Sequence, residues 1–263
     1  MNTLGASPAR GRGWLRLALP AEAGRAKRTE RTTTMTLWLI ILATVALSLI
    51  AAVRVRSVYN RYNQGSVLSG LTGGEAAALI LRRAGIHDVE ITHHDEMLGD
   101  HYDPLNKRLV LSSANYFGST PAALGVAAHE CGHALQHARA YKPLHWRMAA
   151  VGITTYANQA VMWIPLLGIA TGLIAPIVGA IILAVAWGII MLFNLLTLPV
   201  EFDASRRAKA VLANMGLIAP GAEAAAVSKV LNAAAWTYVA AFIISLVYFL
   251  WHLWPLLTGR QRD

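Results

Sequence analysis

Two histidines and a glutamate lie close together at residues 129–133, in the order His-Glu-Cys-Gly-His. In an α-helix, residues four apart lie about one turn apart on the same face, so His129 and His133 can bind one metal ion together. Glu130 follows the first histidine and stands within reach of a water molecule at that ion. Two neutral nitrogen ligands beside a carboxylate are the arrangement that a zinc hydrolase needs. We therefore predict His129 and His133 as zinc ligands and Glu130 as the general base.

The alternative is a helix that carries two exposed histidines by chance. Residues 124–128, which precede the pair, are apolar and helix-forming, and this indicates a buried helix. Buried imidazoles need polar partners, and a metal ion is a suitable one. Cys131 is the single cysteine of the chain, which excludes an intrachain disulfide. It lies roughly opposite His129 on the helix, so we expect it to pack in the core.

The composition is that of an integral membrane protein. Hydrophobic residues make up 56% of the chain and charged residues 14%, against about 25% charged in an average soluble protein. The mean hydropathy is +0.45, the net charge +9 and the isoelectric point about 10.1. The basic residues flank apolar runs instead of forming one stripe, so we interpret them as topology signals. The expected partner is therefore the lipid bilayer and not a nucleic acid.

The elements that would position the motif can be placed along the chain. Short strands are expected at 89–92 and 108–112 with a turn at 101–104, and Thr120 and Pro121 suit the start of the motif helix. The predicted segments are 1–34, a basic tail; 35–53, transmembrane helix 1; 54–120, an α+β part with edge strands; 121–145, the zinc-binding helix; 148–199, transmembrane helices 2 and 3; 200–233, a helical segment; and 236–255, transmembrane helix 4.

Residues 1–34 have two interpretations. They form either a disordered basic tail or a segment upstream of the true start, because Met35 directly precedes the first apolar run. We favour a start at Met35. A cleaved signal peptide is not expected, because the apolar run at 37–53 is long and has no small-residue cleavage site.

A third metal ligand is needed, and the candidates are His137, Glu201 and the histidines between 93 and 101. His137 is two helical turns, about 12 Å along the axis, from His129, so one ion cannot bridge them on a straight helix. Glu201 lies where the third predicted span ends, and two crossings separate it from the motif helix, which places both on the same side of the membrane. The alternative is that Glu201 and Asp203 only mark the membrane boundary and pair with Arg206 or Arg207. We favour the ligand role.

Three segments together resemble the YugP-type neutral zinc metallopeptidases of bacterial membranes: residues 100–104, 127–137 and 198–207. The resemblance covers about residues 35–255. It implies a mainly α, multi-pass helical membrane protein with a small α+β zincin-like catalytic part. It also implies one Zn²⁺ per chain, held by His129, His133 and Glu201, with Glu130 as base. The family is distantly similar to HtpX-type membrane gluzincins, which have an aspartate four residues after the glutamate ligand, where this chain has Ser205.

The expected function is a membrane-embedded zinc metalloendopeptidase that acts on protein or peptide substrates. An extended substrate would lie along a strand edge, with residues 108–112 as the expected edge. Tyr102, His101 and Arg206 are guesses for an oxyanion-stabilising side chain. The alternative function is a zinc-stabilised membrane scaffold or chaperone partner without activity. The resemblance implies a multi-pass protein of the bacterial cell membrane, and the distribution of basic residues predicts that its active site lies on the cytoplasmic side.

Overall fold

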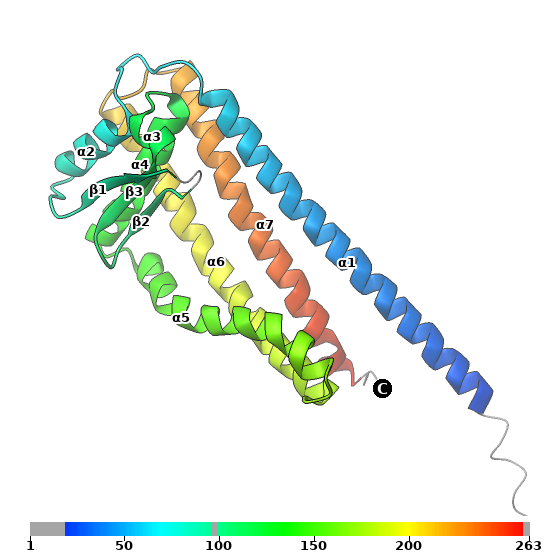
Figure 1. The fold of residues 1–263 in the computed structure, drawn as a ribbon. Helices are drawn as coiled ribbons and strands as arrows, with labels where there is room; N and C mark the ends of the chain where they lie inside the picture. The colour runs from blue at the N-terminus through cyan, green and yellow to red at the C-terminus, as the bar shows by residue number, and fades with distance from the viewer. Residues whose placement is uncertain (1–18, 96–98, 260–263) are drawn as a thin grey trace, which may run out of the picture. The chain divides into compact units, whose positions relative to one another are not determined.

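The computed structural model of the chain describes residues 19–95 and 99–259 (Figure 1). By its internal contacts the chain divides into two units, one that ends at Val45 and one that runs from Ala46 to Gln261. The described elements are α1 (Leu19–Tyr62), α2 (Gly73–Arg83), β1 (Glu90–His94), β2 (His101–Asp103), β3 (Arg108–Ser112), α3 (Ser113–Phe117), α4 (Pro121–Ala138), α5 (Lys142–Trp163), the π-helical turn η1 (Ile164–Ile169), α6 (Pro176–Asn214) and α7 (Ala222–Thr258). The chain is mainly α-helical with a small α+β part, and this prediction is confirmed.

The predicted tail and the first span belong to one helix. Residues 1–18 of the tail lie outside the described part of the chain, and from Leu19 onward the backbone is helical and continues to Tyr62. The residues from 19 to 34 include alanine, glutamate, lysine and arginine, which favour helix. Beyond them, apolar side chains such as Met35, Trp38 and Leu42 are exposed, as on a helix that faces lipid.

The small α+β part contains a three-stranded sheet in the order β1-β3-β2. β1 pairs with β3 in parallel, with Glu90 opposite Arg108, and β2 pairs with β3 antiparallel, with Tyr102 opposite Leu109. The expectation that residues 108–112 form a free edge is wrong, because β3 is the central strand. The segment that was predicted as a turn contains β2, which is the outer strand of the sheet as described. Its three residues are too few to show a strand pattern in the sequence.

Helix α4 is the centre of the core, because most of its faces are covered. Thr120 is its N-cap and accepts a hydrogen bond from the Ala123 amide, and Pro121 occupies its first position, as predicted. The helix packs against α2, α3, α6, α7 and the sheet. Its small residues on several faces allow these close contacts. Cys131 is fully buried, with Sγ 3.8 Å from the Ala77 carbonyl oxygen, so the expectation of a core cysteine is confirmed.

Three helices among the described residues are long and apolar enough to cross a membrane: Arg31–Tyr62 within α1, Pro176–Asn214 and Ala222–Thr258. Helix α5, which the sequence predicted as a further span, is not among them, because polar residues interrupt its apolar sequence. It nevertheless packs along α6 and, with η1, leads from the end of α4 to the start of α6 (Figure 1). The four-span arrangement therefore stays a prediction.

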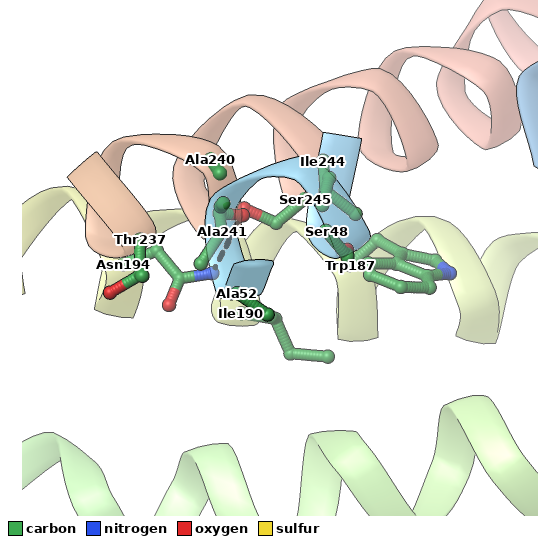
Figure 2. A pocket seen from close by; sticks show the side chains of 11 residues that line it. Ser48, Ala52, Trp187, Ile190, Asn194, Thr237, Ala240, Ala241, Ile244 and Ser245 are labelled. Carbon is green, nitrogen blue, oxygen red and sulfur yellow. Dashed lines mark hydrogen bonds between the residues drawn. The ribbon is translucent and has the colours of Figure 1, made fainter. Parts of the chain in front are cut away.

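Helices α6 and α7 are joined by a polar contact within their apolar lengths (Figure 2). The Asn194 side-chain amide donates to the Ala241 carbonyl oxygen at 3.2 Å and to Ser245 Oγ at 3.1 Å. Ser245 Oγ in turn donates to the Phe242 carbonyl oxygen at 2.9 Å. Amide and hydroxyl side chains that bond across helices in this way stabilise helix association in lipid. The contact holds α7 beside the part of α6 that leads to Glu201.

Candidate metal centre

The two motif histidines lie on one face of α4, as their spacing requires. Their ring centroids are 4.8 Å apart and their planes are nearly perpendicular, at 85°. His133 is buried and His129 is partly buried. The helix itself is held between α2 and α6, so the position of both rings is fixed by a packed core.

Glu201 reaches the histidine pair from α6. Its Oε2 lies 3.3 Å from His129 Nε2 and 3.7 Å from His133 Nε2. Ligand atoms that surround a zinc ion at about 2.1 Å with tetrahedral angles lie about 3.4 Å apart, so these separations fit zinc. Two imidazoles and a carboxylate are also a donor set that zinc accepts. Within residues 19–95 and 99–259, this is the one group of three such side chains close enough to hold a metal ion.

Hydrogen bonds at the far side of each ring orient both histidines. His129 Nδ1 lies 3.2 Å from Ser205 Oγ, and His133 Nδ1 lies 3.0 Å from Gln136 Oε1. Partners at Nδ1 turn the Nε2 atoms toward Glu201 and fix the ring tautomer, which is the usual support of a metal-binding histidine. Ser205 therefore makes the contact with the first histidine.

Asp203 supports the second histidine through a relay. Gln136 is fully buried and donates from Nε2 to Asp203 Oδ2 at 3.0 Å and to the Val200 carbonyl oxygen at 2.7 Å. These bonds leave Gln136 Oε1 to accept from His133. Asp203 also pairs with Arg206 and Arg207, which compensate its buried charge.

The other oxygen of Glu201 has a charged partner. Arg147 of α5 donates from Nη1 to Glu201 Oε1 at 3.1 Å. Glu201 is 2% exposed, and a carboxylate so buried needs such a partner. The alternative interpretation paired Glu201 and Asp203 with Arg206 or Arg207. This is correct for Asp203, which both arginines bind, but not for Glu201, whose partner is Arg147. The basic residue at Glu201 therefore comes from a different helix.

Helices α4 and α6 approach each other closely at the site. A Cβ atom at Gly132 would stand 2.7 Å from the Ala204 carbonyl oxygen and 3.1 Å from its Cα atom. Only glycine fits there without a shift of the α6 backbone. The close approach brings Glu201 and Ser205, on either side of Ala204, within reach of the histidines on either side of Gly132.

Two cavities meet at these side chains, and Glu130 lines both. The larger, of about 270 Å³, lies toward β2 and α5, with His101, Tyr102 and Arg147 in its lining. The smaller, of about 160 Å³, lies toward α1 and α7. Glu130 is thus placed beside the histidine pair with open space on two sides.

The other residues that the sequence suggested as metal ligands or oxyanion-stabilising groups lie outside the metal group. His137 is no part of the metal group and lies 2.9 Å from the Tyr102 hydroxyl through Nδ1, as expected of a residue outside the ligand set. Burial raises the pKa of Tyr102 to about 12, so the phenol keeps its proton. Arg206 is bound to Asp203 and does not line either cavity. His93 and His94 lie in β1 and do not belong to the metal group.

Tyr238 is a site residue that the sequence did not single out. It comes from α7 and lines both cavities, as Glu201 does. It lies in an apolar run that was interpreted only as a span. Its spacing from Leu231, Ala234 and Ala235, which line the smaller cavity, places all four on one face of α7. This periodic face is the one feature of the sequence that could have identified Tyr238 as a site residue.

Comparison with known proteins places the chain in a family. The profile of a family described as "Putative neutral zinc metallopeptidase" matches residues 37–256. The chain belongs to this family. It is 37% identical over 225 residues to the "Putative membrane protease YugP" of Bacillus subtilis (strain 168), which covers 85% of this chain and 98% of that protein. No solved structure matches the chain. The resemblance drawn from three segments is confirmed.

Proposed function

We propose that the protein is a membrane-embedded zinc endopeptidase. One Zn²⁺ would be held by His129, His133 and Glu201, with Glu130 as the general base. The observation that carries this proposal is the convergence of the three ligand atoms beside Glu130 at the junction of two cavities. The family membership and the apolar helices support an action at the membrane.

The residues of the chain divide the chemistry between them. When bound, zinc lowers the pKa of a water molecule and polarises a peptide carbonyl group. Glu130 accepts a proton from the attacking water and delivers it to the nitrogen of the departing amine. Arg147 holds the Glu201 carboxylate in place through its ion pair. Tyr238 is positioned to donate its hydroxyl proton in a hydrogen bond to the carbonyl oxygen as negative charge develops there.

The larger cavity is the proposed place of the peptide main chain. Outer strand β2 contributes His101 and Tyr102 to its lining, and the cavity continues to Glu130. An extended segment can add to such an edge by main-chain hydrogen bonds, which would bring a peptide bond next to the histidine pair. The substrate would then be a protein or peptide with an accessible extended stretch.

The scaffold alternative fits the site less well. A structural zinc site closes its fourth position with a protein ligand. Here three candidate ligands face open space, and a carboxylate outside the ligand set lines that space. A scaffold would gain nothing from either feature.

Comparative proteomics of membrane protein fragments tests the proposed function in cells. Cells that produce wild-type protein should contain cleavage fragments that are lost when Glu130→Gln replaces it at equal abundance. Identical fragment patterns in the two strains would argue for the scaffold alternative.

A further inference from the structure

The smaller cavity at the site has an apolar wall built from three helices. The wall consists of Val55, Val126, Val230, Leu231, Ala234 and Ala235. Val55 comes from α1, Val126 from α4 and the others from α7. Val126 precedes His129 by three residues, so the two share a face of α4. The cavity therefore begins at the proposed reaction centre and extends away from it along apolar side chains.

The size of this cavity suits one apolar side chain. Its volume is about 160 Å³. A cavity of about 150 Å³ lined by aliphatic and aromatic groups stays dry and binds a benzene molecule. A leucine, isoleucine, methionine or phenylalanine side chain has a similar number of carbon atoms. Burial of such a side chain from water contributes about 1.5–3 kcal/mol.

The carboxylates in the lining do not favour a basic side chain. Asp100 accepts hydrogen bonds from the Ser112 amide and hydroxyl and from the Asn115 side chain. Glu201 is paired with Arg147 and faces the histidines. Glu130 lies at the mouth, where both cavities meet. All three carboxylates also line the larger cavity, so the charges stand where the two cavities meet, and the aliphatic wall of the smaller cavity carries none.

We propose that this cavity receives the apolar side chain of a substrate residue next to the cleaved bond, and that Val126 and Ala234 set the size of that side chain. The inference rests on the proposed function, because it assigns the specificity of the same site. The substrate class is then peptides that carry a medium-sized aliphatic or phenylalanine side chain at that position.

Two substitutions change the cavity in opposite directions. Ala234→Leu fills it, and Val126→Ala enlarges it. Ala225→Leu is the matched control, because it makes the same change on an exposed position of α7 outside the cavity. Detergent-solubilised, zinc-loaded proteins are offered peptides that differ only at the residue before or after the cleaved bond, as Gly, Ala, Leu, Phe or Lys.

The peptides form two series, one varied before the cleaved bond and one varied after it. In one of these series, wild type and Ala225→Leu should cleave the leucine or phenylalanine peptide at least about tenfold faster than the alanine peptide. Ala234→Leu should lower that ratio at least tenfold, and Val126→Ala should shift the preference from leucine toward phenylalanine. Unchanged ratios in Val126→Ala, or a preference of wild type for lysine, would overturn the inference. If Ala234→Leu does not fold, Val126→Ala alone decides.

Binding separates this inference from the proposed function. The same peptides are titrated into Glu130→Gln protein by fluorescence anisotropy, with and without Ala234→Leu. Tighter binding of the leucine than of the alanine peptide, lost with Ala234→Leu, supports the cavity even if wild type cleaves nothing, which would refute the peptidase proposal alone. If wild type cleaves peptides but Glu130→Gln binds all five with equal affinity, the proposed role of the cavity is refuted and the peptidase proposal stands.

Discussion

At the scale of single residues, helix spacing and tertiary contacts determine different features of the site. The spacing of His129 and His133 fixes a shared face, but it does not fix how far each ring turns. Ser205 bonds Nδ1 of His129 and Gln136 bonds Nδ1 of His133, and these bonds set the orientation of the two rings. Loss of such partners typically lowers metal affinity 10–100-fold.

Ser205→Ala should therefore raise the zinc dissociation constant about 10–100-fold, because His129 loses the partner that orients it. Ser245→Ala is the matched control, since it removes a buried hydroxyl of α7 that bonds Asn194 away from the site. Competition with a chromogenic zinc chelator measures both constants. Equal constants for the two variants and wild type would show that Ser205 does not support the metal.

Tyr238→Phe should lower kcat about 10²–10³-fold and leave zinc content and KM nearly unchanged. The reason is that the hydroxyl is proposed to act on charge that develops only in the transition state. Tyr156→Phe serves as control, because Tyr156 is 77% exposed on α5. Steady-state kinetics with one cleavable peptide gives both parameters. A rise in KM at constant kcat would instead assign Tyr238 to substrate binding.

The sequence could predict the histidines, Glu130 and the candidate Glu201, but not their supporting residues. The two histidines follow from local periodicity, and Glu201 from its place at the end of an apolar run. Gln136, Ser205 and Arg147 act through contacts between helices far apart in the chain, and no local pattern specifies how α6 is rotated against α4. The resemblance supplied the ligand set, while the contacts behind it became visible only in the fold.

At the scale of elements, the ends of the helices were harder to predict than their existence. The predicted zinc-binding helix at 121–145 ends at Ala138 in the structure, and α5 starts at Lys142. Ala140 has a φ of 50°, and the Tyr141 amide bonds the Gln136 carbonyl oxygen at 2.9 Å, which is the bond of a Schellman end. The usual sign of such an end is glycine, and alanine stands there instead.

Helix α6, in contrast, continues beyond its predicted end. Pro199 stands inside this helix, which continues to Asn214, although the sequence predicted a separate segment from residue 200. Proline removes one backbone hydrogen bond, but helices that cross membranes tolerate it because neighbouring helices compensate. The continuity matters for the site, since one rigid helix carries Glu201, Asp203 and Ser205 beside α4.

Gly132→Ala should lower both the melting temperature and the zinc affinity, because the new Cβ would meet the α6 backbone at Ala204 and push Glu201 away. Gly152→Ala is the control. A Cβ there meets no atom within 4 Å, and alanine is about 1 kcal/mol better than glycine within a helix, so its stability should stay equal or rise. Thermal unfolding with and without added zinc measures both effects. A Gly132→Ala protein as stable and as tightly zinc-bound as Gly152→Ala would show that α4 and α6 can separate freely.

At the scale of the whole molecule, the membrane arrangement is the open prediction. Arginines and lysines gather at the ends of the helices near the catalytic part, such as Arg54, Arg56, Arg147 and Arg207, while the turn at 172–176 has none. Helix α6 starts at that turn and leads to the site, so the chain has to cross from the catalytic part to the turn through α5 and η1. The positive-inside rule then predicts that the active site lies on the cytoplasmic side.

A reporter pair tests this arrangement in bacterial cells. Alkaline phosphatase fused after Asp263 should be active, because the three predicted crossings that follow a cytoplasmic motif helix leave that end outside, and green fluorescent protein inserted near residue 66 should be fluorescent. The same reporters exchanged between the two positions are the control. The reverse pattern at both positions would place the zinc site outside the cell and imply exported substrates.

The most direct test of the central claim is the cleavage of casein by purified protein, measured together with zinc content for wild type and Glu130→Gln. The change removes the base and keeps the size of the side chain. We predict about one zinc per chain in both proteins, and proteolysis in the wild type that falls at least about a hundredfold in the variant. A Glu130→Gln protein that retains zinc and cleaves casein at the wild-type rate would contradict the account.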